Sequence, residues 1–152
     1  MSGGSVTASR ERWEGSPLER AGKDEHEAVD LPAGLSLVGS IEGDACTLVS
    51  FEDAGAGRFL HVSSSSGSYA INGRGPEEAY FFRTTPRDCD GHVSLWIAGF
   101  EWELHRRFVL DRSEAEAAVA ELFEPGAWDF ANGRWEEASV GPDSRPLSLP
   151  TG

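Results

Sequence analysis

Short segments with alternating apolar and polar residues, separated by tight turns, constrain the fold of this chain most strongly. Six strand candidates follow one another, at residues 45–51, 58–63, 68–71, 79–83, 92–98 and 100–110. Asn72-Gly73 and Asp90-Gly91 are strong turn signals, since Asn, Asp and Gly tolerate a positive φ. Strands spaced this closely favour an antiparallel meander over βαβ units.

One helix is clearly indicated after these strands. Ser113 and Glu116 have the spacing of a capping box, in which each side chain bonds a backbone N–H at the helix start. Pro125-Gly126 ends the helix. The apolar residues recur with helical spacing along one stripe: Ala115, Ala118, Val119, Leu122 and Phe123. An antiparallel sheet with this amphipathic C-terminal helix packed on one face predicts the α+β class.

The two ends of the chain differ from its middle in amino-acid composition and in apolar periodicity. Residues 1–34 have little apolar periodicity and many charges, which predicts a flexible acidic N-terminal segment. The alternative there is a short helix around Leu18 to Val29 that would need a partner. Residues 141–152 are rich in Pro, Ser and Gly and predict a flexible C-terminal tail. A single domain at residues 35–140 suits a chain of 152 residues.

The charge balance narrows the choice of partner. The chain has 26 acidic and 13 basic residues, for a formal net charge of −13. This charge repels nucleic-acid phosphates and anionic lipid, so we expect neither a nucleic-acid nor a membrane partner. It would attract a basic protein. The alternative interpretation is that the acidity only confers solubility.

Several features of the sequence predict a cytoplasmic protein. No apolar run approaches the ~18 residues that a membrane span needs. The first five residues are polar and lack the apolar region of a secretory signal. Two cysteines, Cys46 and Cys89, are too few for a disulfide framework and are typical of reduced thiols.

No group of residues predicts catalysis, a metal site or a cofactor. Cys89 and His92 have a C-x2-H spacing, but zinc needs four ligands and the other candidates, Cys46, His61 and His105, are scattered singly. A Cys–His nucleophile pair is the alternative, since its members need only meet in space. The serine run at residues 63–67 lacks the Lys-Ser/Thr of a phosphate-binding loop.

The last strand candidate carries charged residues on one face. Period-two alternation places Glu101, Glu103, His105 and Arg107 together, and it sends Trp102, Leu104, Phe108 and Leu110 to the other face. Any half-exposed strand shows such alternation, and paired-carboxylate catalysis is a further alternative. We select Glu101, Glu103 and Arg107 as candidate contacts for a protein partner.

Two tryptophans after the helix are also candidate contacts. Trp128 and Trp135 flank Asn132-Gly133. Interface hot spots are enriched in Trp, so an exposed indole here would suit a protein contact. Core packing is the alternative for either residue.

The segment from Gly57 to Glu137 resembles the Imm-one family of bacterial immunity proteins from polymorphic toxin systems. The matching elements are a Gly-Arg-apolar-Leu strand at residues 57–62, a turn and short strand ending near Tyr69, the helix at residues 117–123, and Trp135-Glu136. The resemblance implies direct binding of a co-encoded toxin, often a nucleic-acid deaminase. It implies no catalytic residues.

We therefore predict an immunity protein that neutralises a cytoplasmic toxin domain, expected to be basic, through a stoichiometric acidic interface. The alternative is a small-molecule-binding or regulatory module with a pocket between sheet and helix. A hydrolase that uses Cys89 or the pair Glu101 and Glu103 is a third interpretation.

Overall fold

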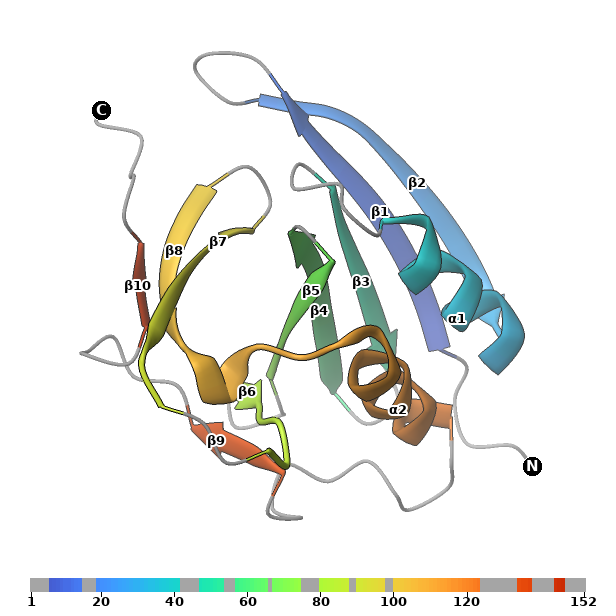
Figure 1. The fold of residues 1–152 in the computed structure, drawn as a ribbon. Coiled ribbons are helices and arrows are strands. Elements are labelled where there is room, and N and C mark those ends of the chain that lie inside the picture. The colour runs from blue at the N-terminus through green and yellow to red at the C-terminus, as the bar shows by residue number, and fades with distance from the viewer. Residues whose placement is uncertain are drawn as a thin grey trace.

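The computed structural model describes residues 6–14, 19–41, 47–53, 57–65, 67–74, 80–87, 90–97, 100–123, 134–137 and 144–146. Within them the elements follow in the order β1 (Val6–Glu14), β2 (Glu19–Val29), α1 (Leu31–Ser40), β3 (Thr47–Asp53), β4 (Arg58–Ser65), β5 (Ser68–Arg74), β6 (Tyr80–Arg83), β7 (His92–Ile97), β8 (Phe100–His105), the 3-10 helix η1 (Arg106–Phe108), α2 (Arg112–Phe123), β9 (Trp135–Glu137) and β10 (Ser144–Pro146). Figure 1 shows α1 and α2 side by side, with β7, β8 and β10 on the other side of the molecule.

The strands form two antiparallel sheets. The larger sheet has seven strands in the order β2-β1-β3-β4-β5-β6-β9, and the smaller has three in the order β10-β8-β7. Strands β3 to β6 are neighbours in chain order, which confirms the antiparallel meander and the α+β class. Each predicted strand from residue 45 to 98 has its counterpart within a few residues. The predicted turn at Asn72-Gly73 is wrong, because both residues lie inside β5.

Alternation along the strands of the larger sheet divides the core into two clusters. Val49, Phe51, Leu60 and Ile71 are fully buried in a first cluster, which also contains the buried residues of α1 and α2. Ala70 precedes Ile71 and therefore faces the opposite side of the sheet. Ala70 and Phe82 belong to a second cluster with residues of β7, β8 and η1, namely Leu95, Leu104 and Phe108. The smaller sheet therefore covers the other face of the larger sheet at β5 and β6.

Helix α2 begins two residues before the predicted start. Asp111 and Glu114, instead of Ser113 and Glu116, form the capping box: Glu114 N donates to Asp111 Oδ1 over 2.7 Å, and Asp111 N donates to Glu114 Oε1 over 2.9 Å. The buried residues are Ala115, Ala118, Val119, Glu121 and Leu122, while Phe123 is half-buried. The apolar residues of the stripe are thus buried, and so is the carboxylate-bearing residue Glu121 beside them, which the apolar pattern did not predict.

Helix α1 falls where the sequence predicts the junction between tail and domain. Asp30 caps it by accepting a hydrogen bond from Ala33 N, and Pro32 lies in the first turn, where no intrahelical donor is needed. Gly34 allows close packing on α2, because an added Cβ would lie 3.1 Å from the Phe123 ring. Val38 is fully buried in the first core cluster.

The prediction of a flexible N-terminal segment is wrong for the residues that the structure describes there. β1 lies between β2 and β3 and pairs with both, and Val6 and Ala8 are buried. A strand with a neighbour on each side is held by its backbone hydrogen bonds, so few apolar side chains suffice. β2 is an edge strand, and its charged sequence suits an edge that must not recruit another chain. The alternative of a helix around residues 18–29 is also wrong.

The prediction of a flexible C-terminal tail is wrong at residues 144–146. β10 pairs with β8, with Arg145 opposite Glu103. Pro146 suits an edge strand, since proline cannot donate to a ladder on both sides.

None of the helices that the structure describes is long and apolar enough to cross a membrane.

Charge inserted on the inner face of β1 should unfold the protein more readily than charge on its outer face. Ala8 is 4% exposed, while the neighbouring Ser9 is half-buried. We expect Ala8→Asp to lower the free energy of unfolding by about 3–5 kcal/mol, the cost of an uncompensated buried charge. Ser9→Asp should lower it by about 1 kcal/mol or less. Urea unfolding measures both, and equal costs would show that β1 is not part of the core.

Candidate functional site

The smaller sheet positions the candidate carboxylates. On β8, Leu104 is fully buried, and on β7 Leu95 is 7% exposed, so one face of this sheet turns to the core. Glu103 is one position out of phase with Leu104 and pairs in register with Ser94, which is exposed. Glu103 is half-buried and lies on the face turned away from the core. Glu101 is two positions earlier on the same strand, opposite Trp96; its side chain lies outside the described part.

Arg107 does not share this face. The strand ends at His105, whose Nδ1 accepts a hydrogen bond from Arg107 N over 3.1 Å and starts the 3-10 turn η1. The Arg107 guanidinium donates through Nε to Glu136 and lies 4.2 Å from the centroid of the Phe108 ring. The predicted strand therefore stops early, and Arg107 links η1 to β9 instead of standing beside Glu103.

Trp135 is a core residue and not a surface contact. It is 6% exposed and belongs to the first core cluster. The Arg83 guanidinium lies 5.3 Å from its ring centroid, a cation–π contact in a dry environment. The candidate contact Trp128 lies outside the residues that the structure describes.

A buried ion pair fixes α2 against β6. Arg83 Nη1 donates to Glu121 Oε1 over 2.8 Å and Arg83 Nη2 to Oε2 over 2.7 Å, with the two side chains 6% and 10% exposed. Arg134 Nη1 adds a bond of 2.8 Å to Oε2. Burial alone raises the pKa of Glu121, but the bonds and charges of Arg83 and Arg134 outweigh it and leave the pKa below its usual value. Glu121 is therefore ionised at neutral pH.

The sequence contains a signal for this ion pair: an arginine at an inward-facing position of a strand. Arg83 has the same parity as Phe81, which packs on the first core cluster. An arginine on an inward-facing position must find a carboxylate, because an unpaired buried charge is too costly to keep. The carboxylate that Arg83 finds is Glu121, which lies next to Leu122 at the edge of the apolar stripe of α2.

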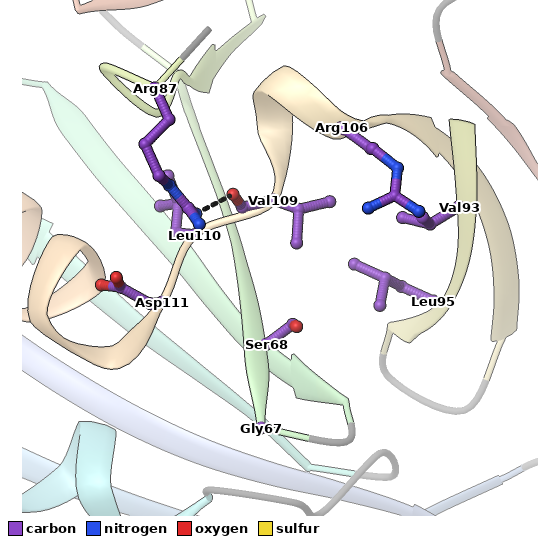
Figure 2. A pocket seen from close by; sticks show the side chains of 9 residues that line it. All are labelled: Gly67, Ser68, Arg87, Val93, Leu95, Arg106, Val109, Leu110 and Asp111. Atoms are coloured by element: carbon purple, nitrogen blue, oxygen red, sulfur yellow. Dashed lines mark hydrogen bonds between the residues drawn. The ribbon is translucent and has the colours of Figure 1, made fainter. Parts of the chain in front are cut away.

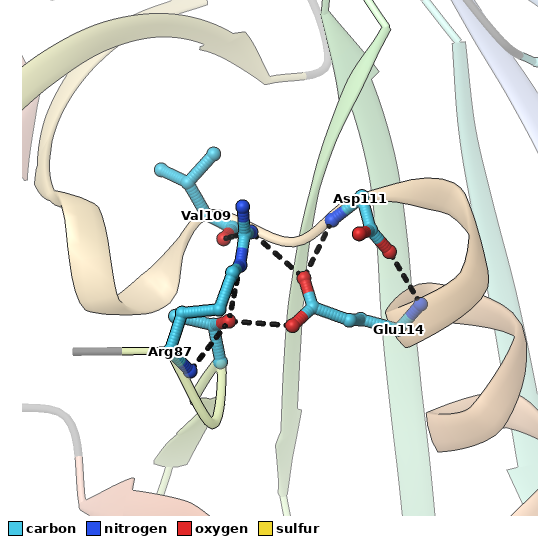
Figure 3. A network of polar contacts seen from close by, with 5 residues as sticks. Arg87, Val109, Asp111 and Glu114 are labelled. Atoms are coloured by element: carbon cyan, nitrogen blue, oxygen red, sulfur yellow. Dashed lines mark hydrogen bonds and ion pairs between the residues drawn. The ribbon is translucent and has the colours of Figure 1, made fainter. Parts of the chain in front are cut away.

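A second polar network ties the chain before α2 to the chain after β6 (Figure 3). Arg87 Nη2 donates to Glu114 Oε1 over 2.8 Å and to the carbonyl of Val109 over 3.3 Å. Thr85 accepts from Arg87 Nε and donates to the second oxygen of Glu114. The positive charge of Arg87 is thus neutralised by the capping carboxylate of α2.

A cavity of about 480 Å³ lies next to this network (Figure 2). Val93 and Leu95 of β7 and Val109 after η1 supply apolar walls. Ser68 at the start of β5 and Arg106 of η1 supply polar groups. The cavity is thus bordered by both sheets and by the segment that leads into α2. This is a pocket at a different place from the carboxylate face of β8.

The histidines do not assemble into a ligand set. No group of three or more His, Cys, Asp or Glu side chains suited to a metal occurs in the described ranges, and Cys46 and Cys89 lie outside them. The rings of His92 and His105 meet edge to face, with centroids 5.2 Å apart. His61 lies on β4, away from these two histidines, and its ring meets that of Phe59 on the same strand at a tilt of 49°. Burial lowers the pKa of His61, Glu11 opposes the shift and Arg74 adds to it, so its imidazole is neutral at pH 7.

Comparisons with known proteins leave the family open. No family model matches the chain, and no curated protein matches it. Among solved structures, the chain is similar to a hypothetical protein from Neisseria gonorrhoeae, with 12% sequence identity and a TM-score of 0.49. That match covers 81% of this chain and 90% of the other.

Removal of the Glu121 carboxylate should destabilise the fold far more than removal of a neighbouring carboxylate on the same helix. Glu121→Ala leaves Arg83 charged and buried, which should cost about 3–5 kcal/mol of unfolding free energy at pH 7. Glu116→Ala removes only the exposed i,i+4 pair with Arg112 and should cost about 0.5 kcal/mol. Urea unfolding of both variants checks this.

The cost of Glu121→Ala should also depend on pH. The folded-state pKa of Glu121 is lowered, so its contribution is fully present above the ordinary value of 4.5 and is lost as the pH falls through the folded-state pKa. We therefore expect the difference between wild type and Glu121→Ala to shrink below pH 4.5. A difference that stays constant to lower pH would contradict the ion pair.

Proposed function

We propose that this chain is an immunity protein that binds a toxin domain in the cytoplasm and neutralises it by stoichiometric contact. In this proposal the chain acts by binding alone, without catalysis or a cofactor. The toxin domain is basic, and neither nucleic acid nor a membrane is a partner. The amphipathic helix α2 serves as the cover of one sheet face, so the contact surface lies elsewhere.

The position of Glu103 carries the proposal. It stands on the face of the smaller sheet that is turned away from buried Leu104, so a partner can approach it without any change of fold. The net charge of −13 adds a field that favours a basic partner at long range. The resemblance of Gly57 to Glu137 to the Imm-one family supports the same function.

The proposed mechanism separates encounter from occlusion. Carboxylates on β8 steer a basic surface and speed association, while they contribute less to lasting affinity. Toxins that act on nucleic acid bind phosphates through basic grooves, and a carboxylate row can take the place of those phosphates. Blocking the substrate groove is sufficient for inhibition.

The structure changes which residues we assign to the contact. Glu101 and Glu103 remain the proposed steering carboxylates, and Trp128 remains a proposed contact. Arg107 and Trp135 are withdrawn, because the guanidinium of Arg107 bonds Glu136 and Trp135 is buried. Arg107 holds β9 through Glu136, and Trp135 is part of the first core cluster.

Affinity purification of the tagged chain from its own cells identifies the partner. We expect a basic domain that is toxic when expressed alone and harmless when co-expressed with this chain. A retained protein that is not toxic, or toxicity that this chain does not relieve, would overturn the proposed function.

Reversal of the two carboxylates on β8 should slow association with that partner. Glu101→Lys with Glu103→Lys should leave the fold intact, since Glu103 lies on the sheet face turned away from the core and is only half-buried; far-UV circular dichroism of the double variant checks this. We expect the association rate to fall about tenfold or more at low salt, and the difference from wild type to shrink as salt rises. Stopped-flow or surface-binding kinetics at two ionic strengths measures both effects.

A matched control separates this face from the general charge of the protein. Glu52→Lys with Glu116→Lys makes the same change in net charge, on β3 and α2. If the steering is local to β8, this control should keep most of the wild-type rate. Equal rates for both double variants would show that the contact surface is not on β8.

A further inference from the structure

The cavity beside η1 has one apolar side and one polar side, and the polar side includes the guanidinium of Arg106. Val93, Leu95 and Val109 form its apolar side. Figure 2 shows the guanidinium of Arg106 reaching toward this side, next to Val93. Among the described residues, the Arg106 side chain takes part in no hydrogen bond or ion pair. A guanidinium beside three aliphatic side chains is the arrangement that binds an anion with an apolar body.

The backbone holds Arg106 in this position. Its amide donates to the carbonyl of Gly91 over 2.9 Å, and Val109 N donates back to the Arg106 carbonyl over 3.0 Å. Gly91 adopts a φ of +90°, which a residue with a Cβ rarely adopts, and this lets the chain turn beside the guanidinium. The base of the Arg106 side chain is therefore fixed before any ligand arrives.

The other charged residues at the cavity are engaged within the chain. Arg87 forms its ion pair with Glu114, with 2.8 Å between Nη2 and Oε1. The carboxylate of Asp111 caps α2 by accepting from Glu114 N. Of the positively charged residues that line the cavity within the described part of the chain, Arg106 is thus the one without an ion pair to another described residue. The negative charge of Asp111 limits how much negative charge the cavity can accept.

The charge and size of the cavity define the class of ligand. A guanidinium presents a planar fork of N–H donors, which matches the two oxygens of a carboxylate. A dianion such as phosphate would be repelled by Asp111 and by the overall charge of −13. A volume of about 480 Å³ lies within the range of small-molecule pockets, roughly 300–1,000 Å³.

We propose that this cavity binds a small monocarboxylate with an aliphatic or aromatic body, with its carboxylate on Arg106 and its body against Val93, Leu95 and Val109. Ser68, at the entrance to β5, adds a hydroxyl that orients the polar end. This site is separate from the proposed toxin contact on β8, and its occupation requires no protein partner.

The test uses 4-phenylbutyrate as the probe and 4-phenylbutan-1-ol as its uncharged counterpart. Each is titrated into the full chain while amide signals are followed by NMR. We expect phenylbutyrate to move the signals of Val93, Leu95 and Val109 with a Kd of about 1 mM or tighter, which is typical of a ligand of this size. The alcohol should bind at least roughly tenfold more weakly, because it lacks the charge-assisted bonds.

Two variants with the same change in charge test the role of Arg106. Arg106→Gln should weaken phenylbutyrate binding roughly ten- to hundredfold, which corresponds to the loss of a charge-assisted hydrogen bond. Arg112→Gln, an exposed arginine on α2 that does not line the cavity, should leave binding unchanged. Arg106→Lys keeps the charge but not the fork and should give intermediate binding.

Three results would each overturn the proposal: no movement of the cavity signals, equal affinity for acid and alcohol, or equal affinity of Arg106→Gln and Arg112→Gln. The comparison of acid and alcohol uses the unmodified chain, so it decides the question even if Arg106→Gln fails to fold. Because no toxin is present, failure here leaves the proposed immunity function unaffected, and failure of toxin binding leaves this site unaffected.

Discussion

The bidentate pair of Arg83 and Glu121 joins strand β6 to helix α2, and the neighbouring residues Arg134 and Trp135 extend this connection to the late strand β9. Both carboxylate oxygens are bonded, so α2 cannot rotate about its axis without breaking the pair. Arg134 bonds the same carboxylate, and its carbonyl accepts from Thr84 N over 2.9 Å, which aligns β9 with β6. Trp135 then packs against Arg83. A buried pair adds little net stability over an apolar equivalent, but it makes alternative packings of these elements costly.

Period-two alternation predicts β3 to β8 because each of these strands has two faces with different surroundings. It fails at β1 and β2, where the ladder to a neighbouring strand holds the chain and few side chains need to be apolar. α1 was missed for a related reason: its sequence contains Pro32, Gly34 and Gly39, which argue against a helix locally. A capped first turn and the space that Gly34 leaves for Phe123 outweigh those propensities.

The candidate site was predictable only where it depends on a single strand. Glu103 follows from alternation with Leu104. Arg107 does not, because the hydrogen bond from its amide to His105 ends the strand two residues before it. Arg106 shows the same limit: the alternation that assigns Leu104 and Phe108 to the inner face would assign Arg106 to it as well, whereas the 3-10 turn exposes Arg106 at a cavity. Contacts between distant segments, such as Arg107 with Glu136, leave no periodic trace in the sequence.

The strand order has a consequence for the synthesis of the chain on a ribosome. β6 pairs on one side with β5, which precedes it closely, but on the other side with β9, which follows some fifty residues later. At ordinary elongation rates the outer edge of β6 is therefore unpaired for roughly 3–10 s. Arg83, the last residue of that edge, is charged and lacks Glu121 for most of this interval, because Glu121 follows 38 residues later, and this charge discourages the open strand from joining another nascent chain. The residue that later fixes the core thus also protects the growing sheet against aggregation.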